Sequence, residues 1–344
     1  MKYYFDWKEE IKKEELNIAI ETIKNDGLIL TPTETVYGIA ASAYSNQACK
    51  KIFIAKGRMQ DNPLIVHVCD KKMIYEIAEE PNEIEEKLIE SFMPGPFTLI
   101  LNKKDTICDV ASANMKTIGV RMPSNKIIHD IIQESQIPLA APSANISGRP
   151  SGTCVEDVLP ELKDKIDIVI DGGKCRIGLE STVVKVIDGV PTILRPGFVT
   201  EQDIKKKIGC VKISDNLFKK IEKDEKVESP GMKYRHYAPK TKCILVECGE
   251  KQIEKINELI KENRNTCVLG FIEDRKLVNV EEDRFISLGS KENLLEISQN
   301  IFSSLRKIDM IENCDLAIIE GVEKEGLGLS IMNRLVRACE NNVK

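Results

Sequence analysis

Histidine and tryptophan are scarce in this sequence, and long apolar runs are absent. The 344 residues include three histidines and one tryptophan. Histidines so few and so widely spread argue against a histidine-rich metal site, and no HExxH motif occurs. No apolar run approaches the length of about 18 residues that a membrane-spanning helix needs. The opening MKYYFDWKEE also lacks the apolar core of a signal peptide. We therefore expect a cytoplasmic protein that makes no membrane contact.

Closely spaced cysteine pairs are absent as well. The chain has 11 cysteines, an odd number scattered singly, and none forms a CxxC pair. Cys243 and Cys248 stand too far apart for a usual zinc knuckle. Without a secretory signal, this pattern does not support a disulfide framework and predicts buried free thiols. We expect no structural metal.

Positive charge is not in excess either. The formal net charge is -5 at pH 7, which argues against a broad nucleic-acid footprint. Strong direct binding of nucleic acid is therefore not expected. A local cationic pocket remains compatible with this composition.

Length and pattern predict two domains. Short apolar runs bounded by turn residues, among them GLILTPT, PLIVHV and TIGVRMP, predict buried strands that alternate with helical segments. STVVKVIDGVPTILRPG is typical of a hairpin that turns at Asp188-Gly189. The segments after Pro239 alternate strand and helix at the spacing of a small parallel domain. The predicted fold class is α/β: a twisted mixed sheet, then a smaller, largely parallel three-layer domain.

A charged stretch separates the two predicted domains. Residues 204–228 hold eight lysines and five acidic residues with few large apolar side chains, which is typical of a linker. We therefore expect domains at 1–203 and 240–344, joined by a linker at 204–239.

The segment AKGRMQDNPLIVHV contains the first candidate site. Helical spacing before it predicts a helix that ends at Gly57, so that Lys56 and Arg58 leave it together. Such a pair suits phosphate or carboxylate oxygens. A KGR by itself is more often a pair of solvated charges, and an exposed Lys56 replaced by alanine should leave the protein folded. His67 shares a strand face with Ile65 and, alone, is more often a half-buried structural histidine.

Two hydroxyl-rich loops follow predicted strands. TPTETVYG comes after GLIL, and PLAAPSANISGRPSGT carries serines, an asparagine and an arginine among glycines and prolines. Such loops hold polar small molecules, although the first is equally typical of a threonine-rich turn.

Two glycine-rich segments carry weaker signals. GGKCRIGLEST has the glycine spacing of a P-loop but places Leu179 where lysine is required, which excludes that motif. GLGLSIMNRL can hold an anion at a helix N-terminus, but a packing turn is the more frequent structure.

The chain contains, in this order, the motifs PTETVYG, KGRMQDNPLIVHV, PGPFTLIL, GVRMPSN, PLAAPSANISGRPSGT, STVV and ILRPG. This ordered set resembles the YrdC-like catalytic domain of threonylcarbamoyl-AMP synthases. The resemblance spans about Leu16 to Thr200. SPGMKYRHYAP and the α/β segment after it resemble the longer, two-domain branch of that family.

The resemblance implies a nucleotidyltransferase, an L-threonylcarbamoyladenylate synthase. Such an enzyme joins L-threonine, bicarbonate or carbon dioxide, and ATP into threonylcarbamoyl-AMP and pyrophosphate, with Mg²⁺ accompanying ATP. The product would pass to a tRNA threonylcarbamoyl transferase for modification of the adenosine beside the anticodon. A metal site made by the protein itself is not implied.

The same resemblance implies site residues, position by position. The catalytic set would be Lys56, Arg58, Ser143 and Asn145. The ATP-binding set would be Arg58, Asn62, Thr117, Ser143, Ser151, Arg195, Tyr234 and His236. The L-threonine-binding set would be Thr35, His67, Arg121, Ala141 and Ser181.

The loop at 229–239 is expected to cover the pocket as a lid, with Tyr234, Arg235 and His236 facing nucleotide or pyrophosphate. Three other functions stay open at this point: an RNA-binding module, a carbamoyl-transfer enzyme of the same fold, and a regulatory protein.

Overall fold

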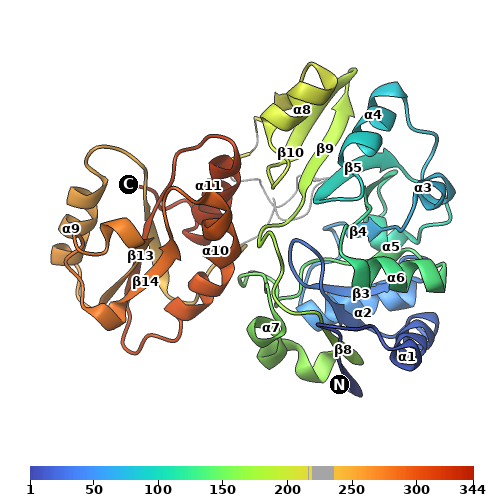
Figure 1. Cartoon of the computed structure of the whole chain (residues 1–344), viewed down its shortest axis with the longest axis horizontal. Helices are drawn as coiled ribbons and strands as arrows, with labels where there is room; N and C mark the ends of the chain where they lie inside the picture. Colours follow the sequence, from blue (N-terminus) through green and yellow to red (C-terminus); the bar gives the residue numbers. More distant parts are fainter. Residues whose placement is uncertain (216, 219–235) are drawn as a thin grey trace. The chain divides into compact units, whose positions relative to one another are not determined.

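The structure, a computed structural model, describes residues 1–215, 217–218 and 236–344. These residues form two compact units, and each is treated by itself below. The first unit contains 1–147, 152–176 and the described part of 180–234. The second contains 148–151, 177–179 and the described residues from 236 to 344. Figure 1 labels the elements along the chain.

The first unit is built on an 11-stranded mixed sheet with the order β1-β8-β2-β3-β7-β4-β6-β5-β9-β10-β11. Parallel and antiparallel neighbours both occur, which confirms the predicted mixed sheet. The strands are β1 (Tyr3–Asp6), β2 (Ile29–Thr31), β3 (Gly38–Ser42), β4 (Ile65–His67), β5 (Phe97–Asn102), β6 (Thr117–Arg121), β7 (Leu139–Ala140), β8 (Ile168–Asp171), β9 (Thr182–Ile187), β10 (Val190–Arg195) and β11 (Lys212–Ile213).

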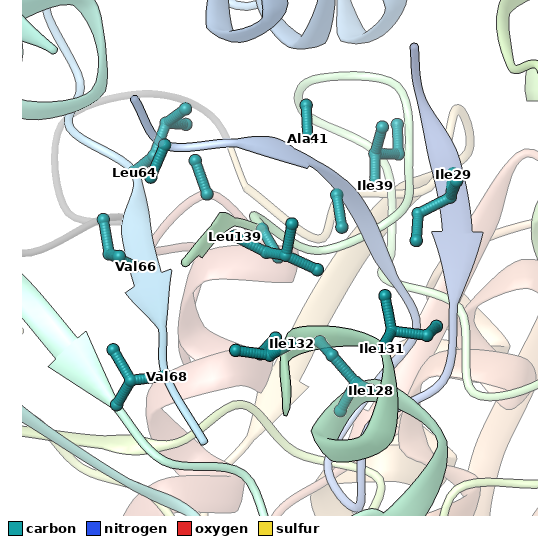
Figure 2. Close-up of a cluster of buried hydrophobic side chains, with 14 of the residues drawn as sticks. Ile29, Ile39, Ala41, Leu64, Val66, Val68, Ile128, Ile131, Ile132 and Leu139 are labelled. Atoms are coloured by element: carbon teal, nitrogen blue, oxygen red, sulfur yellow. The ribbon is translucent and has the colours of Figure 1, made fainter. Parts of the chain in front are cut away.

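Helices pack against this sheet through apolar faces. They are α1 (Lys13–Lys24), α2 (Asn46–Lys56), α3 (Lys71–Ile77), α4 (Glu83–Phe92), α5 (Asp109–Ser112), α6 (Lys126–Ser135), α7 (Val155–Leu162) and α8 (Glu201–Ile208). In α6, Ile128, Ile131 and Ile132 recur at the spacing of one helix face and are fully buried. Figure 2 shows these isoleucines pointing toward side chains of β2, β3, β4 and β7. Among these strands, β4 ends at His67, a residue of the candidate site.

The predicted hairpin is present as β9 and β10, which pair antiparallel around Asp188 and Gly189. Both turn residues have positive φ, 50° and 75°. A two-residue hairpin of this kind requires that conformation, and an Asp-Gly pair adopts it readily.

The expected linker at 204–239 begins with regular structure, so this boundary is corrected. Helix α8 crosses residue 204, and β11 pairs in parallel with β10 of the first sheet. Ile204 is fully buried, and Thr200 and Asp203 form a capping box at the start of α8. Residues up to 213 therefore belong to the first unit. Of the expected lid, 229–235 lies outside the described residues, Tyr234 and Arg235 included.

The second unit contains a four-stranded parallel sheet with the order β12-β15-β13-β14, as predicted. Its strands are β12 (Lys242–Val246), β13 (Thr266–Phe271), β14 (Phe285–Gly289) and β15 (Leu316–Glu320). Its helices are α9 (Gln252–Glu262), α10 (Leu294–Ile308) and α11 (Leu327–Ala338). Within the described ranges of both units, no helix is long and apolar enough to cross a membrane. The cytoplasmic location stays a prediction.

Two short segments from the first half of the sequence pack within the second unit. Arg149 pairs with Asp309 at 2.7 Å, and the Arg306 guanidinium donates to the carbonyls of Pro150 and Ser151. Ser298 Oγ donates to the carbonyl of Ile177 at 2.7 Å. The two units are therefore not continuous stretches of chain, which the sequence pattern did not indicate.

Candidate active site

A row of polar side chains crosses four neighbouring strands of the first sheet. Arg121 ends β6, and His67, which ends β4, is its register partner on the adjacent parallel strand. Thr98 lies on β5, where it precedes Leu99, the partner of Val120. Its hydroxyl is 2.7 Å from that of Ser181, which directly precedes β9. Strand register thus gathers residues that are far apart in the sequence.

Arg121 is the centre of this row. Its NH2 group donates to Thr35 Oγ1 at 2.9 Å and lies 2.7 Å from Glu34 Oε1. The side chains of Arg121 and Glu34 are 5% and 4% exposed, so the ion pair is buried. Arg121 Nε and Glu34 Oε2 have no hydrogen-bond partner among the described residues. Within the described part of the chain, the pair therefore has a buried donor and a buried acceptor that no other protein group satisfies.

His67 is buried beside Arg121. Burial first, and then the positive charge of Arg121, lower the pKa of His67 to about 3. The ring is therefore neutral at pH 7, and its Nδ1 lacks a hydrogen-bond partner within the described part of the chain. A neutral imidazole suits hydrogen bonding to a polar ligand, whereas a general base for work near pH 7 needs a higher pKa.

This lowered pKa predicts acid sensitivity. The unfolded chain takes up a proton on His67 below pH 6.5, whereas the folded protein takes it up only near pH 3. Stability should therefore fall as pH drops from about 6.5 toward 3, by up to about 1.4 kcal/mol per pH unit. Urea unfolding across this range should show a shallower pH slope for His67→Gln than for the parent. His129→Gln is the matched control, and equal slopes for His67→Gln and the parent would contradict this assignment.

Ser181 is held from two sides. Arg195, the last residue of β10, donates through Nε and NH2 to the Ser181 carbonyl, at 3.2 and 2.9 Å. Arg195 NH2 also reaches Ser181 Oγ at 3.2 Å. Arg195, which was predicted to bind ATP, therefore contacts Ser181, which was predicted to bind threonine.

Ala141, also predicted to bind threonine, lies next to β4, where its N–H donates to the Ile65 carbonyl.

Lys56 is buried, which corrects the expectation of an exposed helix-end charge. Helix α2 does end at Lys56, and Gly57 adopts the predicted left-handed conformation with φ 58°. The Lys56 side chain, however, is enclosed by the loop after β7. Its Nζ donates to the carbonyls of Ser143 and Asn145, the latter at 2.8 Å, and to Asn145 Oδ1 at 3.3 Å. Sequence spacing does not reveal this enclosure because it arises from a loop about 90 residues away.

Hydrogen bonds within the loop after β7 hold the groups around Lys56 in place. Ser143 Oγ donates to Asn145 Oδ1 at 2.7 Å, and Asn145 Nδ2 donates to the Ile146 carbonyl at 2.9 Å. The Ser147 N–H closes the contact by donating to the carbonyl of Lys56. The structure thus brings three of the predicted catalytic residues, Lys56, Ser143 and Asn145, into one cluster.

Arg58 and Asn62 form a separate pair in the loop after α2. Arg58 NH2 donates to the carbonyls of Asn62 and Pro63, at 3.2 and 2.9 Å. Asn62 is buried, and its Oδ1 has no hydrogen-bond partner among the residues described. Arg58 is therefore positioned by its own loop, whereas Lys56 is positioned by the loop at 143–147.

The remaining predicted residues lie elsewhere. Thr117 is the first residue of β6 and lies on the same face of the strand as Arg121. It precedes Arg121 by four residues, which separates the two by about 13 Å along the strand. Ser151 is buried in the second unit. His236 also belongs to the second unit and makes an edge contact with the Tyr237 ring. Tyr234 lies outside the described residues. The roles of all four stay predictions.

Sequence reasoning missed Glu34 and Thr98. Glu34 stands inside TPTETVYG, where nothing local indicates that its carboxylate meets Arg121. Thr98 stands in PGPFTLIL, where one hydroxyl in an apolar run was the only signal.

The described residues contain no cluster of three or more acidic, histidine or cysteine side chains that could hold a metal ion. Glu34, the carboxylate in the row, is already paired with Arg121.

Two protein-family models match the sequence of this chain. A model of the Sua5, YciO and YrdC family, described as "Telomere recombination", matches residues 21–197. A model described as "Threonylcarbamoyl-AMP synthase, C-terminal domain" matches residues 199–339.

Curated relatives and solved structures cover the whole chain. The threonylcarbamoyl-AMP synthase of Pyrococcus abyssi is 40% identical over 96% of both chains, and that of Bacillus subtilis is 36% identical over 99% of this chain and 98% of its own. The crystal structure of Pyrococcus abyssi Sua5 complexed with L-threonine is similar with a TM-score of 0.91 and 39% identity, covering 99% of this chain and 98% of that one. The chain therefore belongs to the threonylcarbamoyl-AMP synthase family, in its two-domain form.

Proposed function

We propose that this chain forms threonylcarbamoyl-AMP and pyrophosphate from L-threonine, carbon dioxide or bicarbonate, and ATP. The observation that carries the proposal is the buried Arg121–Glu34 pair with its unused Nε and Oε2 atoms. An amino-acid zwitterion has one carboxylate and one ammonium, so it complements this pair. The names of the full-length relatives and the L-threonine complex of one of them support the same substrate.

In this proposal the polar row binds threonine. Arg121 Nε donates to the substrate carboxylate, and Glu34 Oε2 accepts from its amine. Thr35, His67 and Ser181 supply short polar contacts around them, and the neutral His67 ring adds no charge. Because these groups are buried, each hydrogen bond to the ligand is worth more than it would be in water.

The chemistry then has two steps. The threonine ammonium first loses one proton. The neutral nitrogen then attacks the carbon of carbon dioxide, an N–C bond forms, and a second proton is released to give a carbamate. A carbamate oxygen attacks the α-phosphorus of ATP, and the bond from that phosphorus to the bridging oxygen breaks as pyrophosphate leaves. Two anions must approach each other in the second step, so preorganised positive groups supply most of the catalysis.

Lys56 and Arg58 are the cations proposed for this step. The oxygens around Lys56 hold its ammonium in place before substrate arrives, which limits reorganisation during reaction. Arg58 and Asn62 are proposed to contact ATP phosphates, and Ser143 and Asn145 to position Lys56. Mg²⁺ is proposed to enter as MgATP. A tRNA threonylcarbamoyl transferase is proposed to receive the product.

The direct test incubates purified protein with ATP, Mg²⁺, L-threonine and bicarbonate, and follows the adenylate by mass spectrometry and pyrophosphate by an enzymatic assay. We expect both products only when threonine and bicarbonate are both present. L-Valine, which has a methyl group in place of the threonine hydroxyl, is the matched control substrate and should react far more slowly. Pyrophosphate release that ignores threonine and bicarbonate would overturn the proposal.

A further inference from the structure

The second unit contains a cavity of about 810 Å³ that the proposed synthase function does not use. Its walls follow the carboxyl ends of the strands: Cys248 after β12, Asp274 after β13, Lys291 after β14 and Val322 after β15. In open parallel sheets, ligands bind in the crevice outside these strand ends. The volume is within the usual range for small-molecule sites.

Acidic side chains dominate the walls of this cavity, which we call the acidic pocket. The acids that line it are Glu250, Asp274, Glu292, Glu323 and Glu325. Lys291 is the cation among the described lining residues. Apolar lining comes from Ile253, Phe271, Leu294 and Val322. This charge disfavours nucleotides, phosphate and other anions as ligands.

A buried carboxyl group lies directly behind residues that line the acidic pocket. Glu320 ends β15 and is fully buried. Its Oε2 accepts from the Phe271 N–H at 3.0 Å, whereas Oε1 has no hydrogen-bond partner among the described residues. A Cβ on Gly270 would lie 2.7 Å from Oε2, so a residue without a side chain is needed there. Glu320 is therefore held against the pocket wall by the Phe271 N–H, and its carboxyl meets that of Asp274, which lines the pocket.

The groups that face Glu320 are Asp274, Lys291 and Cys248. Burial first, and then the Asp274 carboxyl, raise the pKa of Glu320 to about 8. Desolvation disfavours its charge, and a second acid beside it disfavours it further. A cation brought close to both carboxyls would therefore be stabilised as Glu320 ionises.

Lys291 shows that an ammonium is accepted here. Its Nζ lies 3.2 Å from Asp274 Oδ1 and 3.3 Å from Oδ2. The Lys291 side chain is 47% exposed, so it reaches Asp274 from the solvent side. Such a half-exposed pair is worth little, and a ligand can displace it.

We propose that the acidic pocket binds a linear aliphatic polyamine. One ammonium group takes the place of Lys291 beside Asp274 and Glu320, and the methylene chain packs on Phe271, Leu294 and Val322. Further ammonium groups meet the exposed acids Glu250, Glu292, Glu323 and Glu325. A polyamine fits better than a divalent cation, because no described cluster has the ligands to hold a metal ion.

The test is titration calorimetry of the full chain with spermidine, without any synthase substrate, so that it stands apart from the proposed activity. We expect saturable binding to the parent protein. Glu323→Gln/Glu325→Gln should bind about tenfold more weakly, since it removes two exposed attractive charges. Glu254→Gln/Glu258→Gln removes two charges from the exposed side of α9, outside the acidic pocket, and should bind like the parent.

Lys291→Met gives the sharpest result because its direction depends on the kind of ligand. It removes the competing ammonium, so spermidine should bind about threefold or more tightly, whereas an anion site would lose affinity. Binding at neutral pH should also release up to about one proton in the parent, visible as buffer-dependent heat, and none in Glu320→Gln.

Three outcomes would overturn the proposal. They are absence of saturable spermidine binding to the parent, weaker binding by Lys291→Met, and equal displacement of spermidine by Mg²⁺ and Na⁺ at matched ionic strength. The last result would mean diffuse charge attraction only.

Discussion

Glu34→Gln is expected to lower the free energy of unfolding by about 3–5 kcal/mol, because the Arg121 guanidinium then stays buried without its carboxylate. Arg121 NH2 and Glu34 Oε1 are 2.7 Å apart, and both side chains are almost fully buried. In the proposed site the same change removes the acceptor for the threonine amine. The KM for threonine should therefore rise by about tenfold or more. Urea unfolding and initial-rate kinetics measure the two effects.

A double variant separates stability from binding. Glu34→Gln/Arg121→Met removes both charges, so it should recover much of the stability that either single change loses. It should not recover threonine binding, because both substrate partners are gone. If the stability losses of the two single variants simply add in the double variant, the buried ion pair is not what stabilises this part of the sheet.

Lys56→Met is expected to reduce turnover by about a hundredfold or more, since the proposed mechanism loses a preorganised charge near the α-phosphate. It should also reduce stability by about 1–3 kcal/mol. The Ser143 and Asn145 carbonyls and Asn145 Oδ1 each lose the hydrogen bond that the buried Lys56 Nζ donates. This reverses the expectation drawn from sequence that the position tolerates substitution without a stability cost.

Lys50→Met is the matched control, because Lys50 lies on the same helix but is exposed. It should change neither turnover nor stability appreciably. Thermal unfolding and the pyrophosphate assay report both properties on the same samples. Full turnover in Lys56→Met would exclude a catalytic role for Lys56. Unchanged stability would contradict the buried hydrogen bonds assigned to its ammonium group.

Local patterns predicted the elements whose geometry depends on neighbouring residues. The Asp188-Gly189 turn and the Gly57 helix end were correct because each needs a positive φ that the sequence can mark with glycine or aspartate. The start of the linker was wrong for the opposite reason. In 204–213 one buried isoleucine and a strand pairing outweigh a charged composition.

In the candidate site, too, local motifs predicted some residues, and contacts between distant parts of the sequence decided the rest. The motifs named Arg121, His67, Thr35 and Ser181, and strand register and loop contacts then bring these residues together on the first sheet. Glu34 and Thr98 were missed because their importance comes from partners about 85 residues away in the sequence. A single sequence does not show which distant side chains meet.

The sequence by itself determined the alternation of strands and helices, the two-domain α/β class and the family resemblance, because these depend on short-range periodicity and on ordered local motifs. Only the tertiary structure decided that Lys56 is enclosed, that Arg121 has a buried carboxylate partner, and that an acidic pocket lies at the carboxyl ends of the second sheet. Burial, pairing and pocket charge are set by strand order and loop packing, which join residues that no local pattern connects.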